Sequence, residues 1–424
     1  MSRLFSARAT FLLASRAQVL YYIIMYRKNV RLLSIFNFLI GFTFFAPLAI
    51  IYFAKVSESY TLGTSIFGVI MLSAAIFEVP TGILSDRVGR RYTIILGSCA
   101  RVVAFIFYAI GLSYWFLVIG AILEGVSRAF YSGNNEAFLY DTLADDGKEG
   151  EYKEHLGKTS SHEFNGLTFS AVIGGLIASI SFTYVMWLAV LSQVIMLIVS
   201  FQFVEPRSRH KENTNIYAHL HEALTLFMTN KKLRLLSLAS ILANSLDELA
   251  YQFRGAFYNT IWPIWAIGFA NIVSNVSASA GLYFSGKILN KMKSETAKLL
   301  QSLFDKFINI ISLVFPTILS PILMSSTSFL YGVGVVAENE LRQREYANNQ
   351  RATMNSLISL GRSIGAALMT VILGRAADIF GPRRALLMMV FLAFSVTYIY
   401  WIIYKNANRK TSIQDKLAKV LKAL

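Results

Sequence analysis

The sequence has few charged residues and many apolar ones. Asp, Glu, Lys and Arg together make up 15% of its 424 residues, whereas hydrophobic residues make up 55%. Soluble domains carry about 25% charged residues, and disordered chains contain far fewer apolar residues than this one. A soluble protein of this length would lack the polar side chains to cover its surface. These deficits exclude both classes and leave a protein that crosses the lipid bilayer several times.

Reactive and metal-binding residues are also scarce. The single cysteine, Cys99, permits no intramolecular disulfide and no cysteine-built metal site. The five histidines form no H-E-x-x-H pair, and no Ser-His-Asp set stands out. The nearest phosphate-binding loop, GLYFSGKI at 281–288, has Ile288 where Ser or Thr is required. The sequence therefore predicts neither an enzyme nor an ATP-driven pump, and it implies no cofactor and no metal.

Twelve apolar runs are long enough to span a membrane as helices, which takes about 20 residues each. They are continuously apolar rather than alternating, so a β-barrel is excluded. We expect an all-α membrane protein with 12 transmembrane helices in two parallel six-helix repeats. The expected spans are residues 33–54, 62–83, 92–112, 115–139, 165–183, 185–204, 235–257, 261–286, 298–318, 322–341, 353–374 and 384–404.

The basic residues indicate the orientation of these spans. With the N-terminus in the cytoplasm, 31 of the 40 Lys and Arg residues fall in inner loops and termini and five in outer loops. This bias predicts cytoplasmic N- and C-termini in a plasma membrane protein. Because the basic residues lie between apolar runs, the net charge of +16 does not indicate nucleic-acid binding. The outer positions Arg375, Arg383 and Arg384 run against the rule and have no explanation in the sequence.

The second half of the chain repeats the first. KNVRLLS at 28–34 recurs as KKLRLLS at 231–237, and NNE at 134–136 recurs as ENE at 338–340. An even number of spans in each half makes the copies parallel. We divide the chain into a cytoplasmic segment 1–30, a half 31–204, a cytoplasmic linker 205–232, a half 233–404 and a basic tail 405–424.

Three of these divisions carry further expectations. Residues 1–30 read either as an amphipathic segment on the membrane surface or as sequence upstream of a true start at Met25. Residues 216–228 of the linker predict a surface helix, on which His219 and His221 point to different faces. The tail 405–424 is patterned for a short helix on anionic lipid.

One dense motif lies between the second and third expected spans. GILSDRVGRR, residues 82–91, matches G-x-L-x-D-R-x-G-R-[RK] at every specified position. The chain therefore resembles the major facilitator superfamily of secondary transporters over residues 28–404. EVPTG at 78–82, SGNNEAFLYDTL at 132–143 and EPR at 205–207 resemble an uncharacterised, efflux-like branch. The resemblance implies a monomer that moves a small-molecule substrate, with protons as coupling ions.

The motif predicts an inner gate that latches the two halves when the cytoplasmic side is shut. Gly82 would allow a close helix approach, and Gly89 a tight turn. Asp86 would meet the positive N-terminus of the eleventh helix, near Ala352. Arg90 would reach an acid at the end of the fourth helix. The predicted inner-gate residues are Gly82, Asp86, Arg87, Gly89, Arg90, Arg91 and Asp141, with Glu78, Glu136, Glu338 and Glu340 close by.

The fifth span contains GLTFSAVIGG, residues 166–175. Antiporters of the superfamily carry G-x-x-x-G-P-x-x-G-G there, and this chain keeps Gly166, Gly174 and Gly175 but lacks the Gly-Pro pair. Two interpretations stay open. The glycines either permit close helix packing or mark an exporter.

Ionisable residues within membrane spans are costly and indicate function. Glu124 and Arg128 share one face of the fourth span, and Asp247 and Glu248 lie in the middle of the seventh. The resemblance implies that spans 1, 4, 7 and 10 line the cavity, which favours these four residues as proton or substrate groups. It makes Arg101 and Asp305 structural pairs. No basic residue lies one turn from Asp247 or Glu248, so we expect one of them to carry protons.

These observations predict a transporter that works by alternating access, with proton-coupled export of small amphipathic molecules as the first interpretation. A proton-coupled uptake symporter for a small polar solute is the alternative. A membrane sensor that kept the fold and lost transport is a further one.

Overall fold

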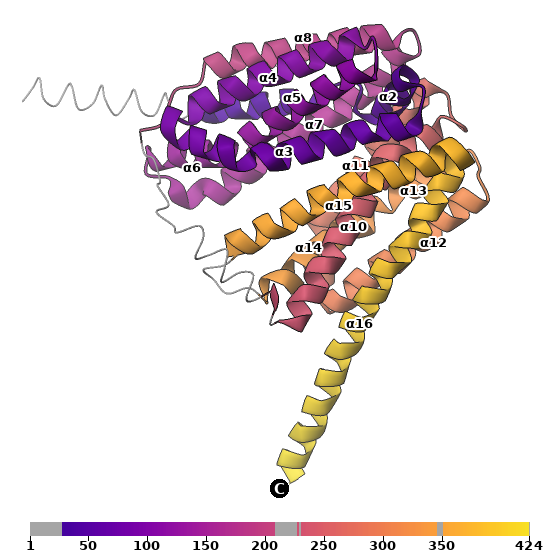
Figure 1. The fold of residues 1–424 in the computed structure, drawn as a ribbon. Coiled ribbons are helices and arrows are strands. Elements are labelled where there is room, and N and C mark those ends of the chain that lie inside the picture. Colours follow the sequence, from indigo (N-terminus) through magenta and orange to yellow (C-terminus); the bar gives the residue numbers. More distant parts are fainter. Residues whose placement is uncertain (1–27, 208–226, 229, 346–350, 424) are drawn as a thin grey trace, which may run out of the picture.

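The computed structural model describes residues 28–207, 227–228, 230–345 and 351–423, and these form helices joined by short turns (Figure 1). The segment 1–27, the expected linker helix with His219 and His221, and the side chains of the tail beyond Arg409 lie outside the described residues. The expected short tail helix is instead the continuation of α16, which runs from Pro382 to Ala423 as one helix.

The first half consists of a helix over residues 28–41 and nine further helical elements. They are η1 (Ala46–Leu48), α2 (Ala49–Ser57), α3 (Tyr60–Val88), α4 (Arg90–Ile110), α5 (Tyr114–Tyr131), α6 (Asn134–Ala144), η2 (Glu149–Glu151), α7 (Tyr152–Ala178) and α8 (Phe182–Phe201). The second half is α10 (Lys231–Tyr258), α11 (Ile264–Leu289), α12 (Ser294–Val314), α13 (Ser320–Ser326), α14 (Ser328–Gln343), α15 (Arg351–Phe380) and α16.

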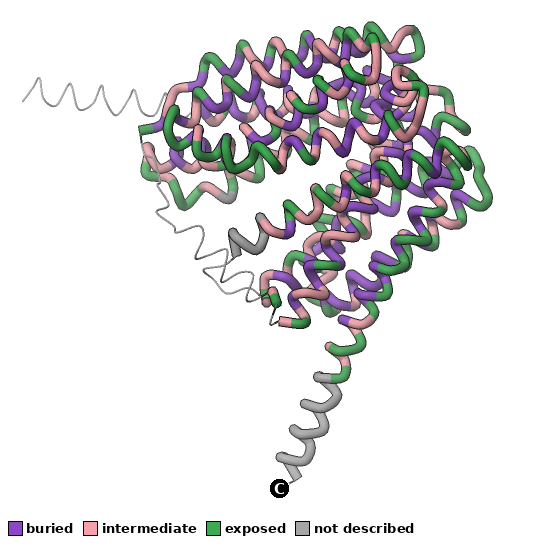
Figure 2. The backbone as a smooth tube through the Cα atoms, viewed as in Figure 1, coloured by how far each residue is buried: buried purple, intermediate pink, exposed green. Residues whose placement is uncertain are grey.

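The two halves meet at one end and diverge at the other (Figure 1). Helix α3 packs along α15, and α7 packs along α11. We call the end that carries α2 and the turn between α15 and α16 the closed end. The end that carries α6 and the start of α10 is the linker end. Figure 2 shows that buried residues concentrate within each half and at the shared closed end.

The all-helical membrane fold is confirmed, and each of the twelve expected spans overlaps a described helix or a broken pair of helices. Within the part of the chain that the structure describes, eight helical segments are long and apolar enough to cross a membrane. The expected spans in α7, α10, α11 and α12 carry more polar and charged side chains, so composition alone does not establish those four crossings.

Three expected spans are interrupted, and all three contribute to the space between the halves. The first breaks between residues 41 and 49, where Phe44 has φ +61°. The fourth breaks between α5 and α6, where Gly133 has φ +67°, a backbone conformation that favours glycine. The tenth breaks at Thr327, between α13 and α14. These breaks expose backbone groups at membrane depth, which is tolerated where the backbone faces protein or a cavity.

The glycines of α7 permit close contact with neighbouring backbone. A Cβ at Gly166 would lie 2.1 Å from the Phe38 carbonyl oxygen, and one at Gly174 would lie 1.7 Å from that of Phe44. A Cβ at Gly175 would lie 2.9 Å from the carbonyl oxygen of Trp265 in the other half. Close packing therefore accounts for all three residues, whatever the direction of transport.

Gly174→Ala should destabilise the protein by about 1–3 kcal/mol, because the new methyl group collides with rigid backbone. Gly157→Ala is a matched control on the same helix, since a Cβ there meets nothing within 4 Å. We expect the control to retain or slightly raise the midpoint of thermal unfolding, measured on purified protein. Equal midpoints for the two variants would contradict the packing role of Gly174.

The closed end is held by polar caps that join helices from different parts of the chain. Asp378 of α15 accepts hydrogen bonds from the backbone N–H groups of Tyr60 and Thr61 at 2.6 and 3.0 Å, so it caps α3 of the other half. Arg383 donates to the carbonyl oxygens of Leu313 and Val314 at 2.6 and 2.7 Å and thereby caps α12. This contact explains why one basic residue stands on the side where the charge bias predicts few.

Candidate functional site

A cavity of about 660 Å³ lies between the two halves. It extends from the level of η1, near the closed end, to the junction of α5 and α6, where the halves diverge (Figure 1). Both halves contribute charged side chains to its wall. Those of the first half are Arg101, Glu124, Arg128, Glu136 and Glu163, and those of the second are Glu248 and Arg254.

Glu124 and Arg128 form a pair on the cavity wall, as their spacing predicts. The Arg128 guanidinium donates to Glu124 Oε1 at 2.7 and 3.1 Å, and Tyr108 Oη donates to Glu124 Oε2 at 2.9 Å. The Glu124 side chain is 7% exposed and that of Arg128 is 51% exposed. The carboxylate is therefore fixed within the wall, whereas the remaining N–H groups of the guanidinium face the cavity.

Asp247 and Glu248 point in different directions from α10. Glu248 lines the large cavity and accepts a hydrogen bond from Gln252 at 2.8 Å. Asp247 instead lines a second cavity of about 130 Å³ within the second half. Of the two expected proton groups on α10, only Glu248 thus borders the space between the halves.

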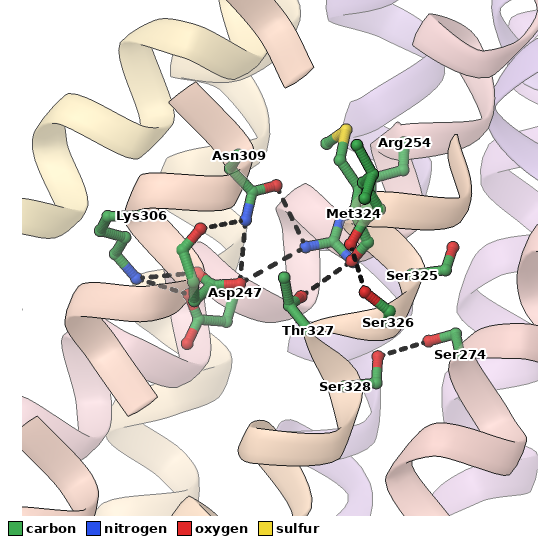
Figure 3. Close-up of polar contacts among 12 residues, drawn as sticks. Asp247, Arg254, Ser274, Lys306, Asn309, Met324, Ser325, Ser326, Thr327 and Ser328 are labelled. Atoms are coloured by element: carbon green, nitrogen blue, oxygen red, sulfur yellow. Dashed lines mark hydrogen bonds and ion pairs between the residues drawn. The ribbon is translucent and has the colours of Figure 1, made fainter. Parts of the chain in front are cut away.

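The expectation that no cation lies near Asp247 is wrong. Lys306 of α12 places Nζ 3.7 Å from Asp247 Oδ1 and 3.2 Å from Asp305 Oδ2 (Figure 3). Helical spacing relates Asp247 only to residues one turn away on α10, and none of these is basic. Helix α12 brings the lysine from 59 positions further along the chain, which no helical periodicity could reveal.

Arg254 belongs to the site, although the count of basic residues by membrane side places it among the five outer-loop residues. It lies within the expected span 235–257, and in the structure it lies within α10. Its guanidinium donates to the Met324 carbonyl oxygen at 3.3 Å and to Asn309 Oδ1 at 3.4 Å, and lies 3.8 Å from Asp305 Oδ1 (Figure 3). The arginine therefore binds a buried carbonyl group next to the break at Thr327, and this carbonyl group also accepts a hydrogen bond from the Thr327 hydroxyl at 2.8 Å.

Two further charged residues depart from the expectations. Arg101 is buried and donates to Gln193 at 2.9 Å and to the Ile40 carbonyl oxygen at 3.0 Å, rather than pairing with an acid among the described residues. Glu163 lies two residues before the predicted fifth span, yet it lines the large cavity on α7. The one sequence feature that indicates a position of Glu163 at membrane depth is its place three residues before Gly166.

Glu338 is predicted to lie close to the inner gate. In the structure it is buried at the centre of an ion-pair cluster in the second half. It contacts Lys298, Arg342, Arg362 and Tyr400, which come from four different helices. The repeat pairs Glu338 with Asn134, a residue that is also buried and accepts a hydrogen bond from Ser85 at 2.6 Å.

The predicted inner-gate residues lie at the linker end. Arg90 places its side chain 3.5 Å from Asp141 and 3.4 Å from Asp86. Asp86 is 67% exposed and Asp141 is 2% exposed. Gly89 has φ +103° between α3 and α4, as a tight turn requires.

Other parts of the motif differ from the expectation. A Cβ at Gly82 would meet nothing within 4 Å, so no close helix approach occurs there in this conformation. Arg91 donates to the Phe201 carbonyl oxygen at 3.0 Å and so joins α4 to α8. Arg87 is exposed in the last turn of α3. The halves diverge at this end, so the motif residues do not join them here.

Comparisons with known proteins agree with this architecture. The chain is 24% identical over 348 residues to the class B tetracycline resistance protein of Escherichia coli, covering 74% of this chain and 80% of that protein. It is 29% identical over 182 residues to the uncharacterized transporter BU466 of Buchnera aphidicola subsp. Acyrthosiphon pisum (strain APS). That match covers 41% of this chain and 43% of the relative, less than half of each.

A solved structure shares the fold. The nucleoside transporter NupG superposes with a TM-score of 0.76 at 11% identity, covering 89% of this chain and 98% of that one. The family model described as Major Facilitator Superfamily matches residues 31–370. With two helical halves around a charged central cavity and a family match over most of its length, the chain belongs to the major facilitator superfamily of membrane transporters.

Proposed function

We propose that this transporter exports small amphipathic molecules across the plasma membrane in exchange for protons. The observation that carries the proposal is the cavity of about 660 Å³ between the halves, which has charged groups on both walls and apolar side chains such as Phe53 and Phe105 beside them. An amphipathic molecule would find both kinds of surface there. The transporter acts as a monomer, because one chain supplies both halves of the cavity.

The basic bias of the loops supports a linker end in the cytoplasm. The cavity then faces the cytoplasm, and the polar caps and helix contacts seal the outer end. Rocking of the two halves would open that end and close the linker end. A relative named for resistance to tetracycline supports export, since removing a compound from the cell confers resistance to it.

Everted membrane vesicles test the direction and the coupling together. With an acidic lumen, an exporter that exchanges substrate for protons accumulates a fluorescent amphipathic dye in the lumen, and a protonophore abolishes the accumulation. A proton-coupled uptake symporter would instead move substrate out of the lumen with protons. A sensor without transport would bind the dye and accumulate none. Vesicles without the protein control for passive entry of the dye.

The inner gate gives a prediction for the closed state. In this conformation Asp86 is exposed and its one ion pair in the described residues is with Arg90. We expect closure to bring Asp86 to the N-terminus of α15, which begins at Arg351, where a carboxylate is stabilised by the helix dipole. Asp86→Asn should therefore lower transport about tenfold while the unfolding midpoint stays near that of the wild type.

Glu154→Gln is the matched control for this prediction. It removes an acid from α7, outside the motif, where the side chains of Glu154 and its partner Lys158 are both more than 60% exposed. Its transport should stay within about twofold of the wild type, since exposed charges contribute little. Full transport by Asp86→Asn in the same vesicles would show that Asp86 is not part of the latch.

A further inference from the structure

The second cavity lies inside the second half, between α10, α12, α14 and α15, and has a volume of about 130 Å³. Its lining is strongly polar. It contains three acids, three cations and two amides, namely Asp247, Glu248, Glu338, Lys298, Arg342, Arg362, Asn244 and Asn339, together with Tyr331. Apart from Asp247 and Glu248, the lining residues have no part in the export mechanism proposed above.

The three cations of this cavity converge on one carboxylate. Lys298 Nζ lies 3.0 Å from Glu338 Oε2, and the Arg362 guanidinium lies 3.4 Å from Oε1. Arg342 Nε lies 3.9 Å from the same Oε1. Tyr400 Oη also donates to Oε2 at 3.0 Å. One negative charge thus faces three positive charges, and the residues involved are largely buried.

The other two acids of the cavity are engaged elsewhere. Asp247 pairs with Lys306, which also pairs with Asp305, and Asp305 in turn lies beside Arg254. Glu248 is hydrogen-bonded by Gln252 on the side of the large cavity. The lining thus holds three cations and three carboxylates, but Asp247 and Glu248 have partners outside the cavity, so three cations face Glu338 alone. An uncompensated buried charge costs several kcal/mol, so this local excess of positive charge is a large deficit.

Two hydrogen-bond donors of the cavity are also unsatisfied. The Nε atoms of Arg342 and Arg362 are buried and find no hydrogen-bond partner among the described residues. The 3.9 Å from Arg342 Nε to Glu338 is too long for a hydrogen bond. A buried donor without a partner is rare and calls for a ligand or an ordered water. A water would satisfy the donors but would leave the excess positive charge.

We propose that the second cavity binds one small monovalent anion, a halide or a carboxylate group, between Arg342 and Arg362. Such an anion supplies the missing negative charge and accepts hydrogen bonds from the two unpartnered Nε groups. It also fits a volume that holds only a few heavy atoms. The carboxylate group belongs either to a free anion or to a transported molecule. The site does not depend on the direction of transport or on proton coupling.

Anion-dependent stability of the purified full chain in lipid nanodiscs tests the proposal. Thermal unfolding is measured at fixed pH and ionic strength in sodium gluconate, whose anion is too bulky for the cavity, and then with chloride, formate or acetate in its place. We expect the midpoint to rise by about 3 °C or more at saturating anion. Equilibrium dialysis with radiolabelled formate gives the affinity without any transport step, so a failed export assay leaves this test intact.

Three variants locate the site. Arg342→Gln and Arg362→Gln each leave Glu338 with two cations, so both should fold, and each should lose the anion-dependent shift and weaken formate binding about tenfold or more. Arg344→Gln is the control, because Arg344 pairs with Glu340 and is 56% exposed. A shift with both chloride and formate supports a free anion, and a shift with carboxylates alone supports the carboxylate of a transported molecule. No difference from gluconate, or an undiminished shift in both Gln variants, would overturn the site.

Discussion

Glu124→Gln should lower transport by about tenfold or more and destabilise the protein. The carboxylate accepts two hydrogen bonds from Arg128 and one from Tyr108 within a wall of the large cavity. Removing one partner of a buried pair costs about 3–5 kcal/mol. Because the Arg128 side chain is 51% exposed, water screens part of the lost interaction, and we expect about 1–3 kcal/mol. The freed guanidinium also loses the orientation in which it faces the cavity.

Glu154→Gln is the matched control. Glu154 and Lys158 form another pair with the same four-residue spacing, but both side chains are more than 60% exposed. Transport and the unfolding midpoint of this variant should stay near the wild type. Both are measured on purified protein, in reconstituted vesicles and by thermal unfolding. Wild-type transport by Glu124→Gln would exclude the pair from the mechanism.

The double variant Glu124→Gln/Arg128→Gln separates a static brace from a working pair. Replacing both partners removes the uncompensated charge, so stability should recover relative to Glu124→Gln. If the pair is only a static brace, the double variant should regain transport together with stability. If the two groups act on substrate or protons, transport should stay at least about tenfold below the wild type. Recovery of both properties would show that Glu124 and Arg128 only hold the wall.

The sequence predicted the fold well because that prediction depends on local composition. Apolar runs of sufficient length fix where helices lie, and the repeat KNVRLLS and KKLRLLS aligns the two halves. Helical spacing likewise predicted the pair of Glu124 and Arg128, since residues four apart share a face. These signals lie within one helix or follow from one periodicity.

Contacts between distant helices were not predictable in the same way. Lys306 reaches Asp247 from α12, and Lys298 and Arg362 reach Glu338 from α12 and α15. No spacing in the chain encodes these meetings, because tertiary packing decides them. Arg254 lies near the end of the expected span 235–257, and only the structure shows that its side chain contacts Asn309 and Met324 of other helices. In the sequence, charged residues within the membrane spans were therefore the best indication that buried ion-pair networks exist there.

Asp247→Asn should abolish accumulation driven by a pH gradient and spare exchange at equal pH. Asp247 and Asp305 share Lys306, whose Nζ lies 3.7 and 3.2 Å from their carboxylates (Figure 3). A proton on Asp247 would free Lys306 to pair with Asp305 alone, so protonation can rearrange the contact between α10 and α12. In Asp247→Asn the lysine keeps Asp305, and we expect the variant to fold. Gradient-driven accumulation should fall at least about tenfold, and exchange should stay within about twofold.

Glu248→Gln distinguishes proton coupling from substrate binding, because Glu248 borders the large cavity and is adjacent to Asp247 on α10. If Glu248 contacts substrate, its replacement should raise KM for exchange at equal pH while a pH gradient still drives accumulation. If Glu248 carries the proton instead, Glu248→Gln should lose gradient-driven accumulation and keep exchange at equal pH. Asp247→Asn should then keep gradient-driven accumulation and show a raised KM for exchange. Both activities are measured in reconstituted vesicles for each variant. Persistence of gradient-driven accumulation in both variants would move the proton site off α10 and make Glu124 the next carboxylate to replace.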